Sequence, residues 1–266
     1  MILNDILLQK RKDLEEFKQR LPISRLQRIV ESTPRTRSRS FVAAVTGTRH
    51  LNVIAELKKA SPSHGVIRED FQPLRIASLY EYAGACAISI LTESHFFKGR
   101  PSYLKTVRQV TTIPLLRKDF IIEKYQIYET AILEADAFLL IASILSENEL
   151  KEFLELGRSL GMDALVEIHT EYDMKKAVNA GARIIGINNR NLKTLTVDPN
   201  LATNMISRIP KGIAVVIESG LSSYDELMMY KSLGASAFLV GTSLIRSPDI
   251  AQSLQRLLGK KGPGLS

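Results

Sequence analysis

The chain has 266 residues, 45% of them hydrophobic and 24% charged, which excludes intrinsic disorder and supplies enough apolar material for a sizeable core. The net charge of +8 includes one basic cluster, Arg35, Arg37 and Arg39, but no aromatic side chains surround it, so we expect no nucleic-acid binding. A single cysteine, Cys86, excludes an intrachain disulfide, and no apolar run is long enough to span a membrane, so the expected location is the cytoplasm.

Residues 2–20 form the first predicted element, an amphipathic helix that ends before Pro22. Its apolar face comprises Ile2, Leu3, Ile6, Leu7, Leu14 and Phe17. Acidic residues interrupt its basic run, which favours packing on a core over binding to a membrane.

From residue 52 the chain repeats a helix, a turn with Gly or Asp beside Ala, and a short apolar strand. The strand candidates are contained in residues 52–57, 80–91, 112–118, 133–141, 160–168, 179–187, 213–219 and 233–241. Eight regular units predict a closed (β/α)8 barrel. The alternative is a doubly wound open sheet, but no G-x-G-x-x-G follows the first strand.

The regions outside these units also carry expectations. Residues 1–48 offer too little core to stand alone, so we expect residues 1–266 to form a single barrel domain with this helical extension docked on it. The interval after the first strand is the longest and predicts a large loop. Part of the extension and this first loop should cover the active face of the barrel.

Polar residues follow five of the strands, at the carboxyl ends where barrels of this kind carry their active sites. These residues are Glu56 and Lys58, Arg117 to Asp119 including Lys118, Glu167, Asn188 to Arg190, and Glu218 with Ser219. Any one of them alone could meet solvent or form a structural ion pair. Charges converging from five strands are costly inside a barrel, which favours a ligand site.

The turns after the last two strands, Ser219-Gly220 and Gly241-Thr242, stand where such barrels bind phosphate. Other candidates for chemistry are weaker. The four histidines lack the spacing of a metal site and are interpreted as solvated or packing residues. Cys86 is interpreted as a small buried hydrophobe. We expect neither a metal nor a cofactor.

Six ordered motifs resemble the indole-3-glycerol phosphate synthase family over nearly the whole chain. They are IAELKKASPSHGVI at 54–67, LTESHFFKG at 91–99, PLLRKDFII at 114–122, ALVEIHT at 164–170, IGINNRNLKTL at 185–195 and VIESGLSS at 216–223, followed by FLVGTSL. The resemblance implies a cofactor-free lyase of tryptophan biosynthesis. It would close the ring of 1-(2-carboxyphenylamino)-1-deoxyribulose 5-phosphate with loss of carbon dioxide and water.

The resemblance also implies roles for individual residues. Lys118 would be the general acid, Glu167 a proton-transfer partner in dehydration, and Lys58 a partner of the substrate carboxylate, with Glu56 holding both lysines in place. Which lysine acts at which step stays open. The glycerol portion would be oriented by Asn188, Arg190, Glu218 and Ser219. Phosphate would bind to Ser61, Gly220, Gly241 and Thr242, and Phe97 would line the aromatic-ring pocket.

Two alternative functions stay open. One is another phosphate-binding barrel enzyme, such as phosphoribosylanthranilate isomerase or the indole-releasing subunit of tryptophan synthase. The other is a catalytically silent barrel that only binds. An isomerase using a cysteine and aspartate pair would need them at strand ends, whereas Cys86 lies early in its strand. No obligate protein partner is evident.

Overall fold

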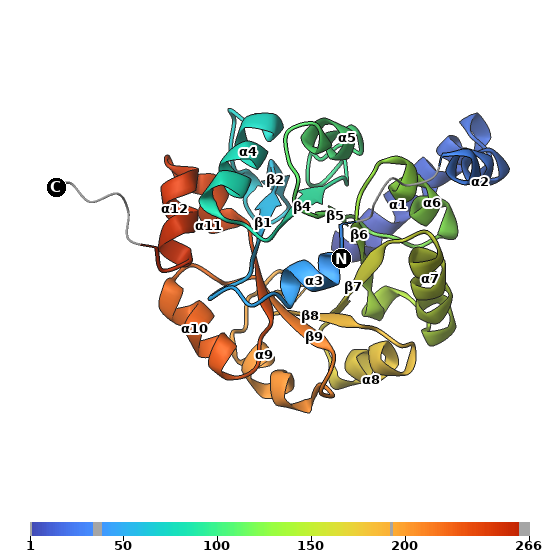
Figure 1. Ribbon diagram of the computed structural model, residues 1–266. Coiled ribbons are helices and arrows are strands. Elements are labelled where there is room, and N and C mark those ends of the chain that lie inside the picture. Colours follow the sequence, from blue (N-terminus) through green and yellow to red (C-terminus); the bar gives the residue numbers. More distant parts are fainter. Residues whose placement is uncertain (1, 34–38, 192–193, 261–266) are drawn as a thin grey trace.

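Eight parallel strands close into a barrel in the computed structural model, which describes residues 2–33, 39–191 and 194–260 (Figure 1). The strands are β1 (Val53–Leu57), β4 (Ala87–Leu91), β5 (Leu115–Lys118), β6 (Ala137–Ile141), β7 (Asp163–Ile168), β8 (Ile184–Asn188), β9 (Ala214–Glu218) and β10 (Ala237–Val240). Each pairs with its chain neighbour, and β10 pairs with β1. The closed (β/α)8 barrel is therefore confirmed, and the open sheet is excluded.

Helices alternate with the strands and surround the barrel (Figure 1). They are α4 (Pro73–Ala83), α5 (Ser102–Arg108), α6 (Lys124–Ile132), α7 (Glu147–Ser159), α8 (Glu171–Asn179), α9 (Asn200–Met205), α10 (Tyr224–Ser232), α11 (Thr242–Arg246) and α12 (Ile250–Leu257), with 3-10 turns η1 (Ala142–Ile144) and η2 (Ile206–Arg208). Capping boxes at Ser146, Thr170 and Ser223 begin three of them. Among the described residues, no helix has the length and apolarity needed to cross a membrane.

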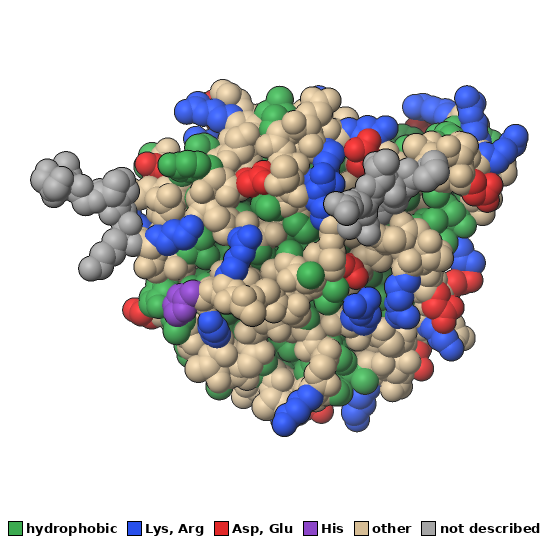
Figure 2. Space-filling view, viewed as in Figure 1, with side chains coloured by type: hydrophobic (Ala, Val, Ile, Leu, Met, Phe, Trp, Pro, Cys, Tyr) green, Lys and Arg blue, Asp and Glu red, His purple; other side chains and the backbone are tan. Residues whose placement is uncertain are grey.

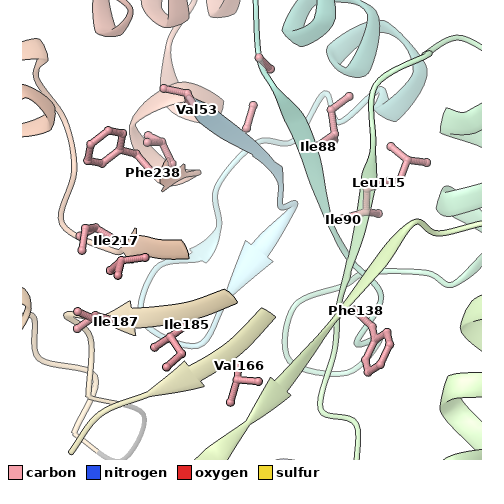
Figure 3. Packing of buried hydrophobic residues seen from close by; sticks show 14 of the residues in the cluster. Val53, Ile88, Ile90, Leu115, Phe138, Val166, Ile185, Ile187, Ile217 and Phe238 are labelled. Carbon is pink, nitrogen blue, oxygen red and sulfur yellow. The ribbon is translucent and has the colours of Figure 1, made fainter. Parts of the chain in front are cut away.

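Side chains alternate along each strand between two apolar layers. Outward residues such as Phe138, Ile185, Ile217 and Phe238 join the cluster between barrel and helices (Figure 3). Inward residues such as Leu116 join a second cluster inside the barrel. The interior of the barrel is thus a packed apolar core. Inward side chains that follow this core at the carboxyl ends of the strands face the open end of the barrel.

Helix α3 (Phe41–Val45) closes the opposite, amino-terminal end of the barrel. Phe41 and Val45 are fully buried in the interior cluster, together with the first residues of several strands, including Ala87 and Ala214. The backbone N–H of Val42 donates to Asp163 Oδ2 at 2.9 Å. Helix α3 is therefore not the part of the extension expected to cover the active face, because its apolar side chains fill the other end.

Helix α1 (Ile2–Arg20) confirms the amphipathic helix predicted at the start of the chain, and α2 (Ile23–Ser32) packs against α6. Leu3, Ile6 and Leu14 of α1 are buried, whereas Phe17, on the same face near the end of the helix, is 44% exposed. Lys10 forms an ion pair with Asp119, which directly follows β5. This helix therefore reaches the carboxyl end of the barrel.

The first loop contains a hairpin of β2 (Ala60–Ser61) and β3 (Gly65–Val66), consistent with the long interval after the first strand. On the molecular surface, Lys and Arg side chains are interspersed with Asp and Glu over the face in view (Figure 2). Arg35 and Arg37 lie outside the described residues.

Candidate active site

A cavity of about 450 Å³ lies at the carboxyl end of the barrel. Every side chain or backbone position proposed for the site lines it: Glu56, Lys58, Ser61, Phe97, Lys118, Glu167, Asn188, Arg190, Glu218, Ser219, Gly220, Gly241 and Thr242. Leu91, Leu139 and Leu239 add apolar surface. The structure thus brings residues from all parts of the barrel around one space, while their chemical roles remain predictions.

Lys118 is the centre of the charged network in this cavity. Its ammonium donates to Glu167 Oε2 at 3.2 Å and also to Glu218 Oε2. Beside it, Lys58 Nζ lies 2.5 Å from Glu56 Oε1. The three carboxylates belong to almost fully buried residues. Each lysine is therefore held by carboxylates in a place with little access to water.

Two glycines leave the space that these carboxylates occupy. A Cβ atom at Gly186, an inward position of β8, would lie 2.2 Å from Glu218 Oε1. A Cβ atom at Gly241 would lie 2.3 Å from Glu56 Oε1. Since real atoms do not approach so closely, any larger residue would displace a carboxylate. Gly241, predicted only for the phosphate end, thus also accommodates Glu56.

The two carboxylates that share Lys118 differ in proton affinity. Burial raises the pKa of Glu218 to about 7, and repulsion from Glu167 and Glu56 adds to the rise while Lys118 opposes it. Burial would also raise the pKa of Glu167, but Lys118, His169 and Asn188 together lower it to about 2. Glu167 is therefore ionised at neutral pH, whereas Glu218 changes its proton state there.

Lys118 itself stays protonated. Burial would lower its pKa, but the facing carboxylates, Glu218 foremost, raise it above the ordinary value. Glu218 Oε1 is buried and has no hydrogen-bond partner among the described residues. That oxygen is the place where a proton can reside.

His169 is a contact of the site that the sequence interpretation missed. Its Nε2 lies 3.1 Å from Glu167 Oε1, and its Nδ1 is buried without a partner among the described residues. Burial would lower the pKa of His169, but the bond to Glu167 raises it. Although His169 was interpreted with the other histidines as a solvated or packing residue, it therefore contacts a residue proposed for the site. The available signal was the two-residue spacing from Glu167.

The turns after β9 and β10 form one end of the cavity. Ser219 and Gly220 both have positive φ, 65° and 76°, and Ser243 Oγ donates to Leu221 O at 3.1 Å, which joins the two turns. Gly241 and Thr242 stand at the start of α11. Backbone N–H groups at a helix start and in such turns suit an anion.

Basic side chains line this end of the cavity. His64 and Arg246 line the cavity with Arg190, although neither is among the residues predicted for the site. Burial lowers the pKa of His64, and the charges of Arg246, Arg190 and Lys58 lower it further. The signal for Arg246 was its position four residues after Thr242, one helical turn away.

The aromatic side of the cavity is built by the loop after β4. The buried carboxylate of Glu93 accepts hydrogen bonds from the backbone N–H groups of His95, Phe96 and Phe97 at 2.7 to 2.9 Å. The ring of Phe97 lies 6.2 Å from that of Phe120. Glu93 therefore fixes the loop that presents Phe97.

Two polar residues at the strand ends point away from the cavity. Arg117 is buried against α6, where it contacts Glu129 at 2.7 Å and Thr130 at 3.0 Å. Asn189 accepts from Ala202 N at 3.1 Å. Both alternate with inward neighbours, which explains their direction. Among the described residues, no group of His, Cys, Asp and Glu side chains is arranged to hold a metal ion.

Comparison with known proteins identifies the family. A model of the indole-3-glycerol phosphate synthase family matches residues 3–257. The chain belongs to this family. Proteins named indole-3-glycerol phosphate synthase are 48% identical in Campylobacter jejuni subsp. doylei and 47% identical in Sulfurimonas denitrificans. Both matches cover 97% of this chain, and 100% and 98% of those proteins.

Solved structures with much lower identity share the fold alone. A 3-hexulose-6-phosphate synthase has a TM-score of 0.64 at 11% identity, over 79% of this chain and 99% of that one. The N-acetylmannosamine-6-phosphate 2-epimerase from Clostridium perfringens has a TM-score of 0.58 at 16% identity, over 79% of this chain and 93% of that one. These matches support the barrel independently of the family assignment.

Proposed function

We propose that the chain converts 1-(2-carboxyphenylamino)-1-deoxyribulose 5-phosphate into indole-3-glycerol phosphate, carbon dioxide and water, as a carboxy-lyase of tryptophan biosynthesis. The observation that carries the proposal is the placement of Lys118 between Glu167 and Glu218, beside the pair of Lys58 and Glu56. This set supplies acids and bases in one buried place. Membership of the indole-3-glycerol phosphate synthase family indicates the substrate.

Ring closure forms a bond between the ring carbon that bears the carboxylate and the substrate ketone carbon. Lys118, protonated at the outset, donates a proton to the ketone oxygen as this bond forms. Lys58 pairs with the carboxylate that leaves as carbon dioxide. The ionised Glu167 then accepts a proton in the dehydration that completes the indole. Glu56 and Glu218 hold the two lysines.

The remaining cavity residues orient the substrate. Ser61, Ser219, Gly220, Gly241 and Thr242 bind the phosphate. The positive charge of Arg246, which lines the cavity there, favours the same anion. Asn188 and Arg190 hold the glycerol portion, and Phe97 packs against the aromatic ring. The residues proposed for the chemistry and those proposed to bind the phosphate thus line one cavity.

A turnover assay tests the function directly. Purified protein with the substrate, a chelator and no added cofactor is expected to form indole-3-glycerol phosphate and carbon dioxide in equal amounts. The first product is measured by its indole fluorescence. A barrel that only binds would bind the substrate and produce neither. The isomerase alternative is disfavoured because Cys86 is buried at the amino-terminal end, and burial raises the pKa of its thiol to about 12.

Thr242→Asp is expected to raise KM for the phosphorylated substrate by about tenfold or more, which corresponds to about 1.4 kcal/mol, with a smaller change in kcat. The added carboxylate would repel the phosphate at the start of α11. Thr203→Asp on α9, an exposed site that does not line the cavity, is the matched control and should leave KM unchanged. Equal KM values for Thr242→Asp and the parent would show that the substrate phosphate does not bind at this end of the cavity.

The pH profile of kcat/KM is expected to contain an ionisation near pH 7 that Glu218→Gln abolishes. Below that pH Glu218 holds a proton and binds the Lys118 ammonium less strongly, so kcat/KM should fall as the pH falls. Glu155→Gln, an exposed control outside the cavity, should keep the parental profile. If kcat/KM of Glu218→Gln falls at low pH as it does in the parent, the ionisation belongs to the substrate phosphate or to another group.

We further propose that residues 1–266 act as one domain, with residues 1–48 as its docked extension, in the cytoplasm and without an obligate protein partner. The contacts of α1 and α3 with the barrel and the lone buried Cys86 support this. Sedimentation of the purified chain and cooperative unfolding as a single transition test it.

A further inference from the structure

The segment next to Lys118 is fixed by a buried ionic network that begins on the N-terminal helix. Lys10 Nζ on α1 lies 2.8 Å from Asp119 Oδ1, and the two side chains are 10% and 1% exposed. The other oxygen, Oδ2, accepts from Thr92 Oγ1 at 2.6 Å and from Arg117 at 3.1 Å. Asp119 thus joins α1, the end of β4 and the end of β5.

This network clamps Lys118 from both sides. Arg117 precedes Lys118, Asp119 follows it, and the two flanking side chains pair with each other across it. Since successive side chains on a strand point in opposite directions, the pairing of Arg117 with Asp119 leaves the Lys118 side chain directed into the cavity. The backbone N–H of Phe120 donates to Asp119 Oδ1 at 2.8 Å, which extends the clamp to the next residue.

Lys10 is the member of this clamp that comes from outside the barrel. Burial would raise the pKa of Asp119, but Lys10 and then Arg117 lower it to about 2, so the carboxylate is ionised and depends on both cations. Leu3 and Ile6 of the same helix belong to the interior cluster that contains Phe120. Helix α1 therefore supports both the clamp and the aromatic side of the cavity.

We propose that Lys10 is a positioning residue of the active site, which holds Asp119 and thereby fixes the strand end that presents Lys118. This inference rests on the proposed acid role of Lys118. A misplacement of about 1 Å at a reacting group can cost about 10²-fold in rate. Loss of the Lys10 ammonium should therefore slow the chemical step without weakening substrate binding, because Lys10 does not line the cavity.

The test compares Lys10→Met with Lys18→Met in the full-length chain. Lys18 is on the same helix and also pairs with a barrel residue, Glu123 at 3.0 Å, but that pair does not include Asp119. Lys10→Met is expected to lower kcat by about 10- to 100-fold with KM within about threefold of the parent. Lys18→Met should leave both constants within about twofold. Lys10→Arg, which keeps the charge, should recover most of the lost kcat.

Several outcomes would overturn the inference. One is a kcat in Lys10→Met within about threefold of the parent. Another is an equal loss of kcat in the two methionine variants, which would indicate general loosening of α1. If Lys10→Met does not fold, Lys10→Gln is judged by the same criteria. A parent enzyme without turnover would instead refute the proposed function, so the two failures are distinguishable.

Discussion

Lys118→Met is expected to lower kcat by at least about 10²-fold, the lower end of what general acid catalysis contributes, while substrate affinity changes much less. Methionine keeps most of the stem but cannot donate a proton to the ketone. Lys58→Met should instead weaken binding more than turnover, because Lys58 pairs with the substrate carboxylate. Steady-state and single-turnover measurements on both variants separate the two effects.

The structure also predicts how the stability of the Lys118→Met variant depends on pH. Without Lys118, Glu167 and Glu218 face each other with no shared cation, and an unpaired buried charge costs about 3 to 5 kcal/mol. The carboxylates then take up a proton, so their pKa values in the folded state rise. The variant should therefore be closest to parental stability at low pH and lose stability as the pH rises through the raised pKa.

A double variant distinguishes loss of stability from loss of the acid. Lys118→Met combined with Glu218→Gln removes one of the two facing charges and should recover part of the stability at high pH, but not the turnover. Near-parental kcat in Lys118→Met would refute the acid role. If Lys118→Met lost mainly binding and Lys58→Met mainly turnover, the role would pass to Lys58.

Glu167→Gln is expected to lower the rate of indole formation by about 10²- to 10⁴-fold, because the amide cannot accept a proton in the dehydration. Glutamine preserves the shape of the side chain, and His169 and Asn188 can still bond to it. Decarboxylation precedes this step, so carbon dioxide should be released faster than indole appears. In Lys118→Met the block comes earlier, and both products should be lost together.

Parallel measurement of carbon dioxide release and indole fluorescence in a single turnover checks this difference. Glu171→Gln is a suitable control, because Glu171 is an exposed residue of the same β7–α8 region that does not line the cavity. Equal loss of both products in Glu167→Gln would assign Glu167 to ring closure. If Glu167→Gln releases carbon dioxide and forms indole at the parental rates, Glu167 has no role in either chemical step.

The residues inside the barrel illustrate what local pattern determines. Glu56 and Lys58, Asn188 and Arg190 stand two apart, and a strand places such residues on one face whatever surrounds it. The turns after β9 and β10 likewise follow from short stretches of sequence. For this reason the eight strands, the closed barrel and the gathering of these side chains at one mouth could be predicted without coordinates.

The partners of those side chains could not be predicted from the same patterns. Whether Lys118 meets Glu167, Glu218 or Glu56 depends on the tilt and stagger of the closed barrel, and hence so do the opposed pKa shifts of Glu167 and Glu218. The space left by Gly186 for Glu218 also exists only across two neighbouring strands.

The N-terminal extension shows the limit most clearly. Amphipathic periodicity determined that residues 2–20 form a helix, because apolar spacing is a local property of 3.6 residues per turn. It could not place α3 at the amino-terminal end, or bring Lys10 to Asp119, which lies far along the sequence. Such contacts join segments that only the closed barrel brings together, so the sequence by itself determined the elements and the tertiary structure decided which of them support the active site.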